Sequence, residues 1–176
     1  LQKLPKVITV GKNVKTIGER AFARCNALTE LRVADGNTAF QSIDGVLYTA
    51  DGKTLVAYPT AKADTAYTVA LGTETIGAYA MYFCAAQTVT LPDTVKVIEA
   101  NAFAYSSQLT TLNLPAGLTT IGVQAFFNCS ALTSAAIPAS VTEIGQGAWA
   151  GCGSLKSIDA AADSNAFRTV DGVLYT

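Results

Sequence analysis

The chain has 176 residues, a formal net charge of -1 at pH 7 and 50% hydrophobic residues, with four cysteines and no histidine. Its lysines and arginines are scattered, which argues against nucleic acid or an anionic membrane surface as a partner. No apolar run approaches the roughly 18 residues of a membrane-spanning helix, so we expect no membrane insertion by this segment.

A twelve-residue motif, I-G-x-x-A-F-x-x-C-x-x-L, recurs along the chain. It is complete at residues 17–28 and 121–132, and looser copies begin at Ile76, Ile98 and Ile144. The anchoring isoleucines lie 59, 22, 23 and 23 residues apart, so the period is 23 residues with one long insertion. A period of about 20 to 30 residues predicts a solenoid, which buries a continuous core between neighbouring turns. We therefore expect residues 1–176 to form a single domain.

Each motif follows a segment of alternating hydrophobicity, which is typical of a strand. A second short extended stretch leads to the I-G pair, where glycine suits a tight bend or a positive φ. The A-F-x-x-C spacing then predicts a single helical or 3₁₀ turn packed inward. About seven turns result, with strands that start at Ile8, Leu31, Tyr67, Val89, Leu112, Ala135 and Ile158.

Stacked turns place equivalent residues about 4.8 Å apart when their strands pair in parallel. The motif's aromatic position should then form one internal spine through all the turns. Its members are Phe22, Met81, Phe103, Phe126 and Trp149.

The long step between Ile17 and Ile76 contains two β-rich runs, 47–49 and 54–58, on either side of residues 50–53. This pattern predicts a β-hairpin inserted near residues 40–60, which turns at Asp51-Gly52 and projects from the solenoid.

The sequence of the insertion recurs at 166–176, so we expect the start of a second hairpin there. We expect residues 173–175 to lack a hairpin partner. We expect this end to fray or to pair with another chain, giving end-to-end or edge-strand self-association through the C-terminus. Because the repeats are cut at both ends, the chain is expected to be a fragment of a longer protein.

The unit L-x-L-P-x-x-V-x-x-I-G-x-x-A-F-x-x-C-x-x-L is nearly complete at 112–132, and F-x-x-x-D-G-V-L-Y stands at 40–48. These residues resemble the BspA-like, or TpLRR-type, leucine-rich repeats of bacterial surface proteins. The resemblance implies a right-handed superhelix of short parallel strands and short helical turns, secreted or displayed on the cell surface and used in adhesion. Glu99, Ser106 and Gln87 depart from the motif's glycine, cysteine and leucine.

All four cysteines, Cys25, Cys84, Cys129 and Cys152, occupy one repeat position. Their side chains should point the same way along the stack, which disfavours disulfides. Without histidine a mixed zinc site is also disfavoured. We therefore expect four free thiols that are buried as small hydrophobes and do not react in the native state.

Other chemical sites find little support. The Asp-Gly pairs at 44–45, 51–52 and 171–172 lack the alternating acidic ligands of an EF-hand, and turn formation explains them better. No Ser-His or Cys-His pair can form. We expect no catalytic residue, no metal site and no cofactor.

Two surfaces are candidates for binding. The first is the outward face of the strands, with Arg32, Thr68, Thr90, Asn113 and Asp159; a solvated sheet is the simpler interpretation. The second is an aromatic cluster at the variable positions of the central motifs. Packing between turns or under the hairpin is the alternative for this cluster, and we favour it. Its residues are Tyr79, Tyr82, Phe83, Tyr105 and Phe127.

The sequence thus predicts a non-catalytic extracellular module that binds a protein or glycan ligand on a host or neighbouring cell, in bacterial surface adhesion. One alternative is a structural spacer that recognises nothing itself. The other is a repeat region appended to a surface enzyme.

Overall fold

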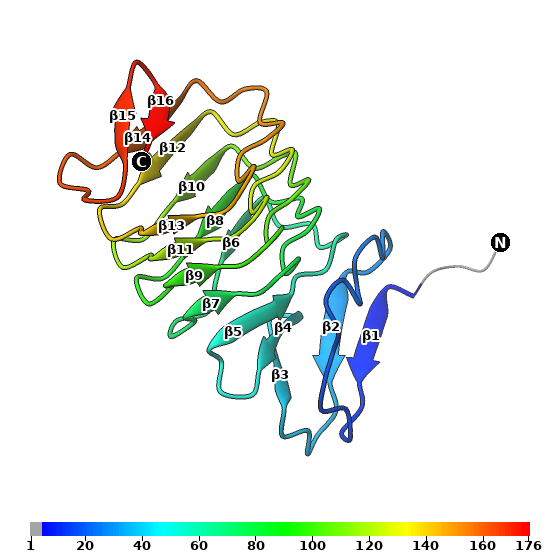
Figure 1. Ribbon diagram of the computed structural model, residues 1–176. Helices are drawn as coiled ribbons and strands as arrows, with labels where there is room; N and C mark the ends of the chain where they lie inside the picture. Colours follow the sequence, from blue (N-terminus) through cyan, green and yellow to red (C-terminus); the bar gives the residue numbers. More distant parts are fainter. Residues whose placement is uncertain (1–4) are drawn as a thin grey trace.

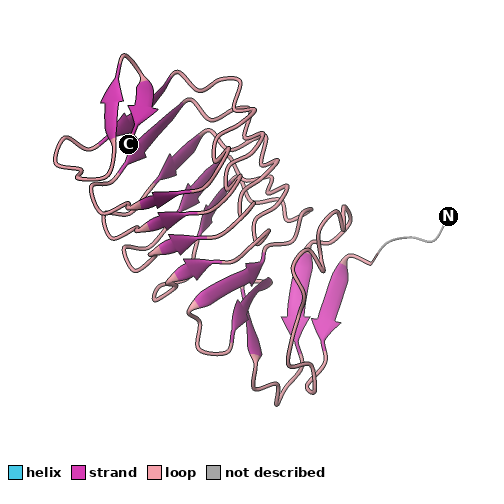
Figure 2. Ribbon diagram, in the orientation of Figure 1, coloured by secondary structure: helices cyan, strands magenta, loops and turns pink. Residues whose placement is uncertain are grey.

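The computed structural model describes residues 5–176; the first four residues of the expected domain lie outside this range. The chain winds into a β-solenoid of about seven turns (Figure 1). Residues 5–176 consist of strands, turns and irregular loops, with no helix among them (Figure 2). Accordingly, nothing in this range is a helix able to cross a bilayer.

Seven strands open successive turns and together form the front face. Their expected positions are confirmed to within one residue. They pair in parallel at equivalent repeat positions, so Thr68, Thr90 and Asn113 are direct neighbours. The pairing stops between β2 and β6 and again between β10 and β12. The strands are β1 (Val7–Val10), β2 (Glu30–Val33), β6 (Ala66–Thr68), β8 (Thr88–Thr90), β10 (Thr111–Asn113), β12 (Ser134–Ile137) and β14 (Ser157–Ala160).

A second parallel ladder runs along the opposite side of the turns. From Ile76 onward it pairs the isoleucine of each I-G corner with its equivalent one turn away, as in Ile98 with Ile121, and Leu55 pairs with Ile76. Its members are β5 (Thr54–Ala57), β7 (Thr75–Ile76), β9 (Val97–Ile98), β11 (Thr120–Ile121) and β13 (Glu143–Ile144).

The inserted hairpin is present, but the expectation that it projects from the solenoid is wrong. β3 (Phe40–Ile43), β4 (Val46–Thr49) and β5 form an antiparallel meander, and β5 pairs in parallel with β7. The turn at 50–53 is confirmed. Leu47, Tyr48 and Leu55 are fully buried. Burying such large apolar side chains stabilises the fold by about 1.5–3 kcal/mol each, so the meander is built into the core.

Two Asp-Gly pairs make tight hairpin turns. Asp44 and Gly45 join β3 to β4, and Asp171 and Gly172 join β15 (Arg168–Val170) to β16 (Val173–Tyr175). All four residues have positive φ, between 51° and 78°, as a type I′ turn requires. The expectation that 173–175 lacks a hairpin partner is therefore wrong, because β16 pairs with β15.

The A-F-x-x-C segments are not helical, contrary to the sequence prediction. We call the segment from the motif's isoleucine to its cysteine a rung: residues 17–25, 76–84, 98–106, 121–129 and 144–152. The fourth and eighth residues of every rung have positive φ. Alternate N–H groups close turns within the rung, such as Ala80 N to Gly77 O at 3.0 Å. The others reach the next rung, such as Met81 N to Ala102 O at 2.8 Å, so the rungs form a ladder. A helix would consume all these N–H groups internally.

From Gly77 onward, the glycines of the I-G corner serve close approach between turns, whereas Gly18 has no atom within 4 Å of a built Cβ. None of the glycines at this corner has the positive φ that the sequence suggested. A Cβ on Gly77 would lie 2.9 Å from Leu55 O, and one on Gly122 would lie 2.6 Å from Ala100 N. A side chain there would push neighbouring backbones apart.

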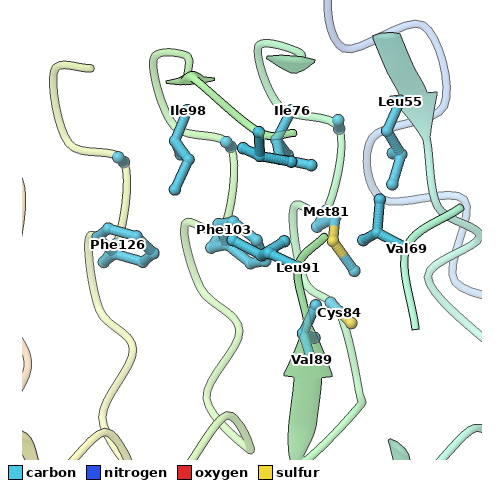
Figure 3. Close-up of a cluster of buried hydrophobic side chains, with 14 of the residues drawn as sticks. Leu55, Val69, Ile76, Met81, Cys84, Val89, Leu91, Ile98, Phe103 and Phe126 are labelled. Atoms are coloured by element: carbon cyan, nitrogen blue, oxygen red, sulfur yellow. The ribbon is translucent and has the colours of Figure 1, made fainter. Parts of the chain in front are cut away.

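The core consists of two clusters. The larger one runs from β4 to the C-terminal turns, and Figure 3 shows Ile76, Met81, Ile98, Phe103 and Phe126 within it. Phe126 stacks between Phe103 and Trp149, with ring centroids 5.4 and 5.6 Å apart. The smaller cluster lies under β1 and β2 and includes Phe22. The spine of the sequence prediction is therefore not continuous, because Phe22 belongs to the other cluster.

Candidate binding surface

The five predicted aromatic residues lie together on three neighbouring rungs, and we call Tyr79, Tyr82, Phe83, Tyr105 and Phe127 the aromatic strip. Phe83 stacks on Tyr105 at 5.0 Å between ring centroids, and Phe127 meets Tyr105 edge-on at 5.4 Å. Tyr82 contacts three of the other rings and is only 7% exposed. The packing interpretation therefore fits Tyr82, while the other four side chains are half-buried and reach the surface.

Two arginines of the first rung extend the strip. The Arg20 guanidinium lies 5.1 Å from the Tyr79 ring centroid, and that of Arg24 lies 5.8 Å from the Phe83 ring. Both distances suit a cation–π interaction. Both arginines are exposed, and neither forms an ion pair with the described residues. Sequence spacing alone does not place them beside the strip, because 59 residues separate Ile17 from Ile76.

The strip carries backbone strain. Tyr79, Phe83 and Tyr105 have φ of 57°, 58° and 62°, and Arg20 and Arg24 have 63° and 61°. This left-handed conformation costs a non-glycine residue about 1–2 kcal/mol. The last rung has glycine at both equivalent places, Gly147 and Gly151. Bulky side chains are thus held on the central rungs where glycine would be less costly.

A cleft of about 170 Å³ adjoins the strip, between rung 17–25 and rung 76–84. Arg20 and Phe22 line one side, Ala78 and Tyr82 line the other, and β5 with Tyr58 completes the lining. Glu19 and Glu99 also line the cleft, and Glu99 Oε2 accepts a hydrogen bond from Ala78 N at 2.8 Å. The only sequence signal of this cleft is the irregular 59-residue step.

The structure divides the front-face candidates. Thr68, Thr90 and Asn113 form one exposed row on β6, β8 and β10. Arg32 and Asp159 lie on separate sheets. Arg32 is held by Glu30, with Nε to Oε1 at 2.7 Å and Nη2 to Oε2 at 3.0 Å, and this hydrogen-bonded pairing lowers the pKa of Glu30. The small threonine row supplies little contact area compared with the aromatic strip.

The model of the BspA type leucine rich repeat region matches six copies, over residues 3–44 and 68–170. The chain belongs to this family. No curated protein sequence matches the chain.

Solved structures of bacterial repeat proteins are similar to this BspA-type chain. Pneumococcal vaccine antigen PcpA superposes with a TM-score of 0.84 at 29% identity, covering 91% of this chain and 40% of PcpA. A leucine rich cell surface protein of Faecalibacterium prausnitzii gives 0.67 at 28% identity, covering 97% of this chain and 52% of that protein. T. pallidum TpLRR gives 0.52 at 21% identity, covering 87% of this chain and 57% of TpLRR, and shows the fold alone. The chain thus spans only part of each of these proteins.

The cysteine position of the BspA-type motif has a hydrogen-bonding role. All four cysteines are free thiols. Cys129 Sγ donates to Phe103 O and Cys152 Sγ to Phe126 O, both at 3.1 Å, so each thiol bonds the preceding rung. Burial raises the pKa of Cys84 to about 12. The neighbouring Cys152 thiol, and then burial, raise the pKa of Cys129.

Proposed function

We propose that this chain is a non-catalytic, extracellular binding module of a bacterial surface protein, and that the aromatic strip with Arg20 and Arg24 is its main contact surface. The ligand is a protein or glycan on a host or neighbouring cell, and the role is adhesion. The recurring residues of the motif are used for stacking the turns, which leaves recognition to the variable residues between them.

The observation that carries this proposal is the strip's composition at strained positions. Aromatic and arginine side chains dominate binding energy at protein interfaces, and exposed ring faces also suit sugars. Three aromatic residues and two arginines have left-handed backbone where glycine would cost less. Every rung has this conformation at its fourth and eighth residues, so the distinguishing feature of the strip is the bulky aromatic or arginine side chain at these places, where the last rung has glycine. This choice of side chain supports a role beyond folding.

The extracellular location is supported by the family's relatives. The similar structures include a vaccine antigen and a cell surface protein.

The test is a binding screen of the chain against matrix proteins and glycans, with the Tyr105→Ser, Phe127→Ser double variant. These two side chains are half-buried, unlike Tyr82, so their loss should leave the fold intact. We expect the double variant to lose binding at least about tenfold, since each interface anchor contributes over about 1 kcal/mol. Val123→Ser, which removes a 48% exposed valine on the rung of Phe127, is the control.

Full binding by the double variant would refute the strip as the contact surface. Failure of the wild-type chain to bind any ligand in the screen would favour the spacer role instead.

A further inference from the structure

The hydrogen-bond ladder between rungs is open at one step, from rung 17–25 to rung 76–84. From rung 76–84 onward, the N–H groups of the fourth, sixth and eighth residues donate to three carbonyls of the next rung. In rung 17–25 these groups belong to Arg20, Phe22 and Arg24. None of the three N–H groups makes a hydrogen bond within residues 5–176.

The facing side of this step is also incomplete. By the same register, the carbonyls of Ala78, Ala80 and Tyr82 should accept hydrogen bonds from the preceding rung. Ala80 O accepts from Tyr58 N at 2.7 Å. The carbonyls of Ala78 and Tyr82 accept none from the part of the chain that the structure describes.

The chain's topology explains the open step. The second turn contributes β2 to the front face and β5 to the second ladder. After β5 the chain does not form a rung; Thr60 Oγ instead bonds Cys25 O at 2.8 Å, and Ala61 N bonds Leu28 O at 2.9 Å. The cleft therefore lies where one rung of the solenoid is missing, between a row of free donors and two free acceptors.

We propose that this cleft binds an extended peptide segment of a partner protein, which takes the place of the first part of the missing rung. The peptide's carbonyls accept from the N–H groups of Arg20 and Phe22, and one of its N–H groups donates to the carbonyl of Ala78. Tyr58, whose N–H group bonds Ala80 O, closes the cleft on the side of Tyr82. Only an extended backbone offers donors and acceptors along both edges, as in strand addition to a sheet. The cleft volume, about 170 Å³, is similar to the roughly 150 Å³ that holds a benzene-sized group, so it admits one side chain of the peptide.

The lining sets the chemistry of the segment. Val56, Ala57 and Tyr58 favour a small apolar side chain in the cleft. Glu19 and Glu99 line the cleft together with Arg20, which disfavours an acidic segment or a free anion. This inference rests on the proposed function, and deepens it by naming a peptide backbone as the ligand.

The experiment selects short random peptides, displayed on phage, against the chain. Selected peptides are then synthesised with a single N-methyl group at each backbone position in turn. We expect methylation at alternate positions to weaken binding about tenfold, because each removes a backbone hydrogen bond and adds a clash. Hydrogen exchange at the Arg20 and Phe22 amides should slow when the unmodified peptide is added.

Ala78→Trp tests the position of the peptide, because it fills the cleft from one wall. Ala100→Trp is the matched control, since it introduces the same side chain at the same rung position one turn on, where the ladder is closed. Loss of binding by Ala78→Trp but not by Ala100→Trp supports the inference. The exchange measurement uses the wild-type chain, so it stands even if Ala78→Trp disturbs folding.

Peptides that tolerate every N-methyl group, or that leave exchange at Arg20 and Phe22 unchanged, would overturn the inference. Glycan binding without any peptide binding would overturn it too, while leaving the aromatic strip as the proposed site. Conversely, peptide binding at the cleft, together with full ligand binding by the Tyr105→Ser, Phe127→Ser variant, supports the cleft and refutes the strip.

Discussion

The cysteine position of the motif is best understood as a small buried donor, and not merely as a small hydrophobe. Cys129 and Cys152 each direct a thiol to a carbonyl of the preceding rung. Ser106, which departs from the motif, makes the same bond to Met81 O at 2.9 Å and also accepts from Cys84 N at 3.2 Å. Serine and cysteine are thus equivalent here, because both supply one donor in little volume.

Ser106→Ala should lower the free energy of unfolding by about 1–3 kcal/mol, since it removes the donor to a buried carbonyl. Ser106→Cys restores the motif's cysteine and should lower the free energy of unfolding clearly less. Urea denaturation of both variants measures the difference. Equal losses would show that packing, and not the hydrogen bond, sets the preference.

The thiols should differ in reactivity according to their burial. Cys84 and Cys129 are buried and have raised pKa values, whereas Cys25 and Cys152 are half-buried. Because the thiolate is the reactive form, we expect Cys84 and Cys129 to resist a thiol reagent near neutral pH until denaturant is added. Mass spectrometry of the labelled chain identifies each site. Rapid native labelling of Cys84 would contradict this account.

At the scale of elements, the distance between turns is set by backbone contact at the I-G corner. Where the motif departs from glycine, Glu99 uses its side chain to bond Ala78 N on the preceding turn. The rungs depend on the same spacing, since their N–H groups must reach the next rung at about 2.7–3.2 Å. Enlarging one corner therefore strains two ladders.

Gly122→Ala should destabilise the chain by about 1–3 kcal/mol, the typical cost of overpacking. Its Cβ would lie 2.6 Å from both Ala100 N and Glu99 C. Gly18→Ala is the matched control, because no atom lies within 4 Å of the new Cβ. Thermal melts of both variants test the prediction, which would fail if the two shifts were equal.

At the scale of the whole molecule, buried phenols link the inserted meander to the solenoid. Tyr48 and Tyr67 share a hydrogen bond of 2.6 Å between hydroxyl oxygens, and Tyr58 bonds Asp64 at 3.1 Å. Burial raises the pKa of all three phenols, and that of the Cys84 thiol to about 12. Each group favours its protonated form when folded.

This arrangement predicts how stability depends on pH. With no histidine, no side chain with an ordinary pKa titrates between about pH 6 and 8, so stability should be flat there. Above about pH 9 the unfolded chain loses protons from thiols and then phenols, while the folded chain keeps them. The unfolded state then binds fewer protons, so the free energy of unfolding falls with pH.

Urea midpoints measured from about pH 6 to 11 test this dependence. Tyr67→Phe removes one buried phenol, and its stability should fall less steeply above about pH 10. Rising stability in this range would contradict the assignment of buried, protonated phenols.

The periodicity of the sequence was enough to predict the repeat, the front strands and the inward-facing positions. The reason is that stacked equivalent turns require apolar residues at the same positions in each copy. The Asp-Gly pairs likewise revealed turns, since few residues tolerate positive φ. The aromatic strip was also visible, because its members lie on consecutive copies of the motif.

Only the tertiary structure decided how the insertion joins the solenoid. The spacing of A-F-x-x-C suits a helical turn, but neighbouring rungs compete for the same N–H groups and hold the chain in alternating left-handed turns. The place of Arg20 and Arg24 beside Tyr79 and Phe83 depends on a 59-residue detour whose path is set by burial of Leu47, Tyr48 and Leu55. The same detour leaves one rung unformed. The cleft at that place could not be predicted from the sequence, because it is formed by residues that are distant in sequence and share no local pattern.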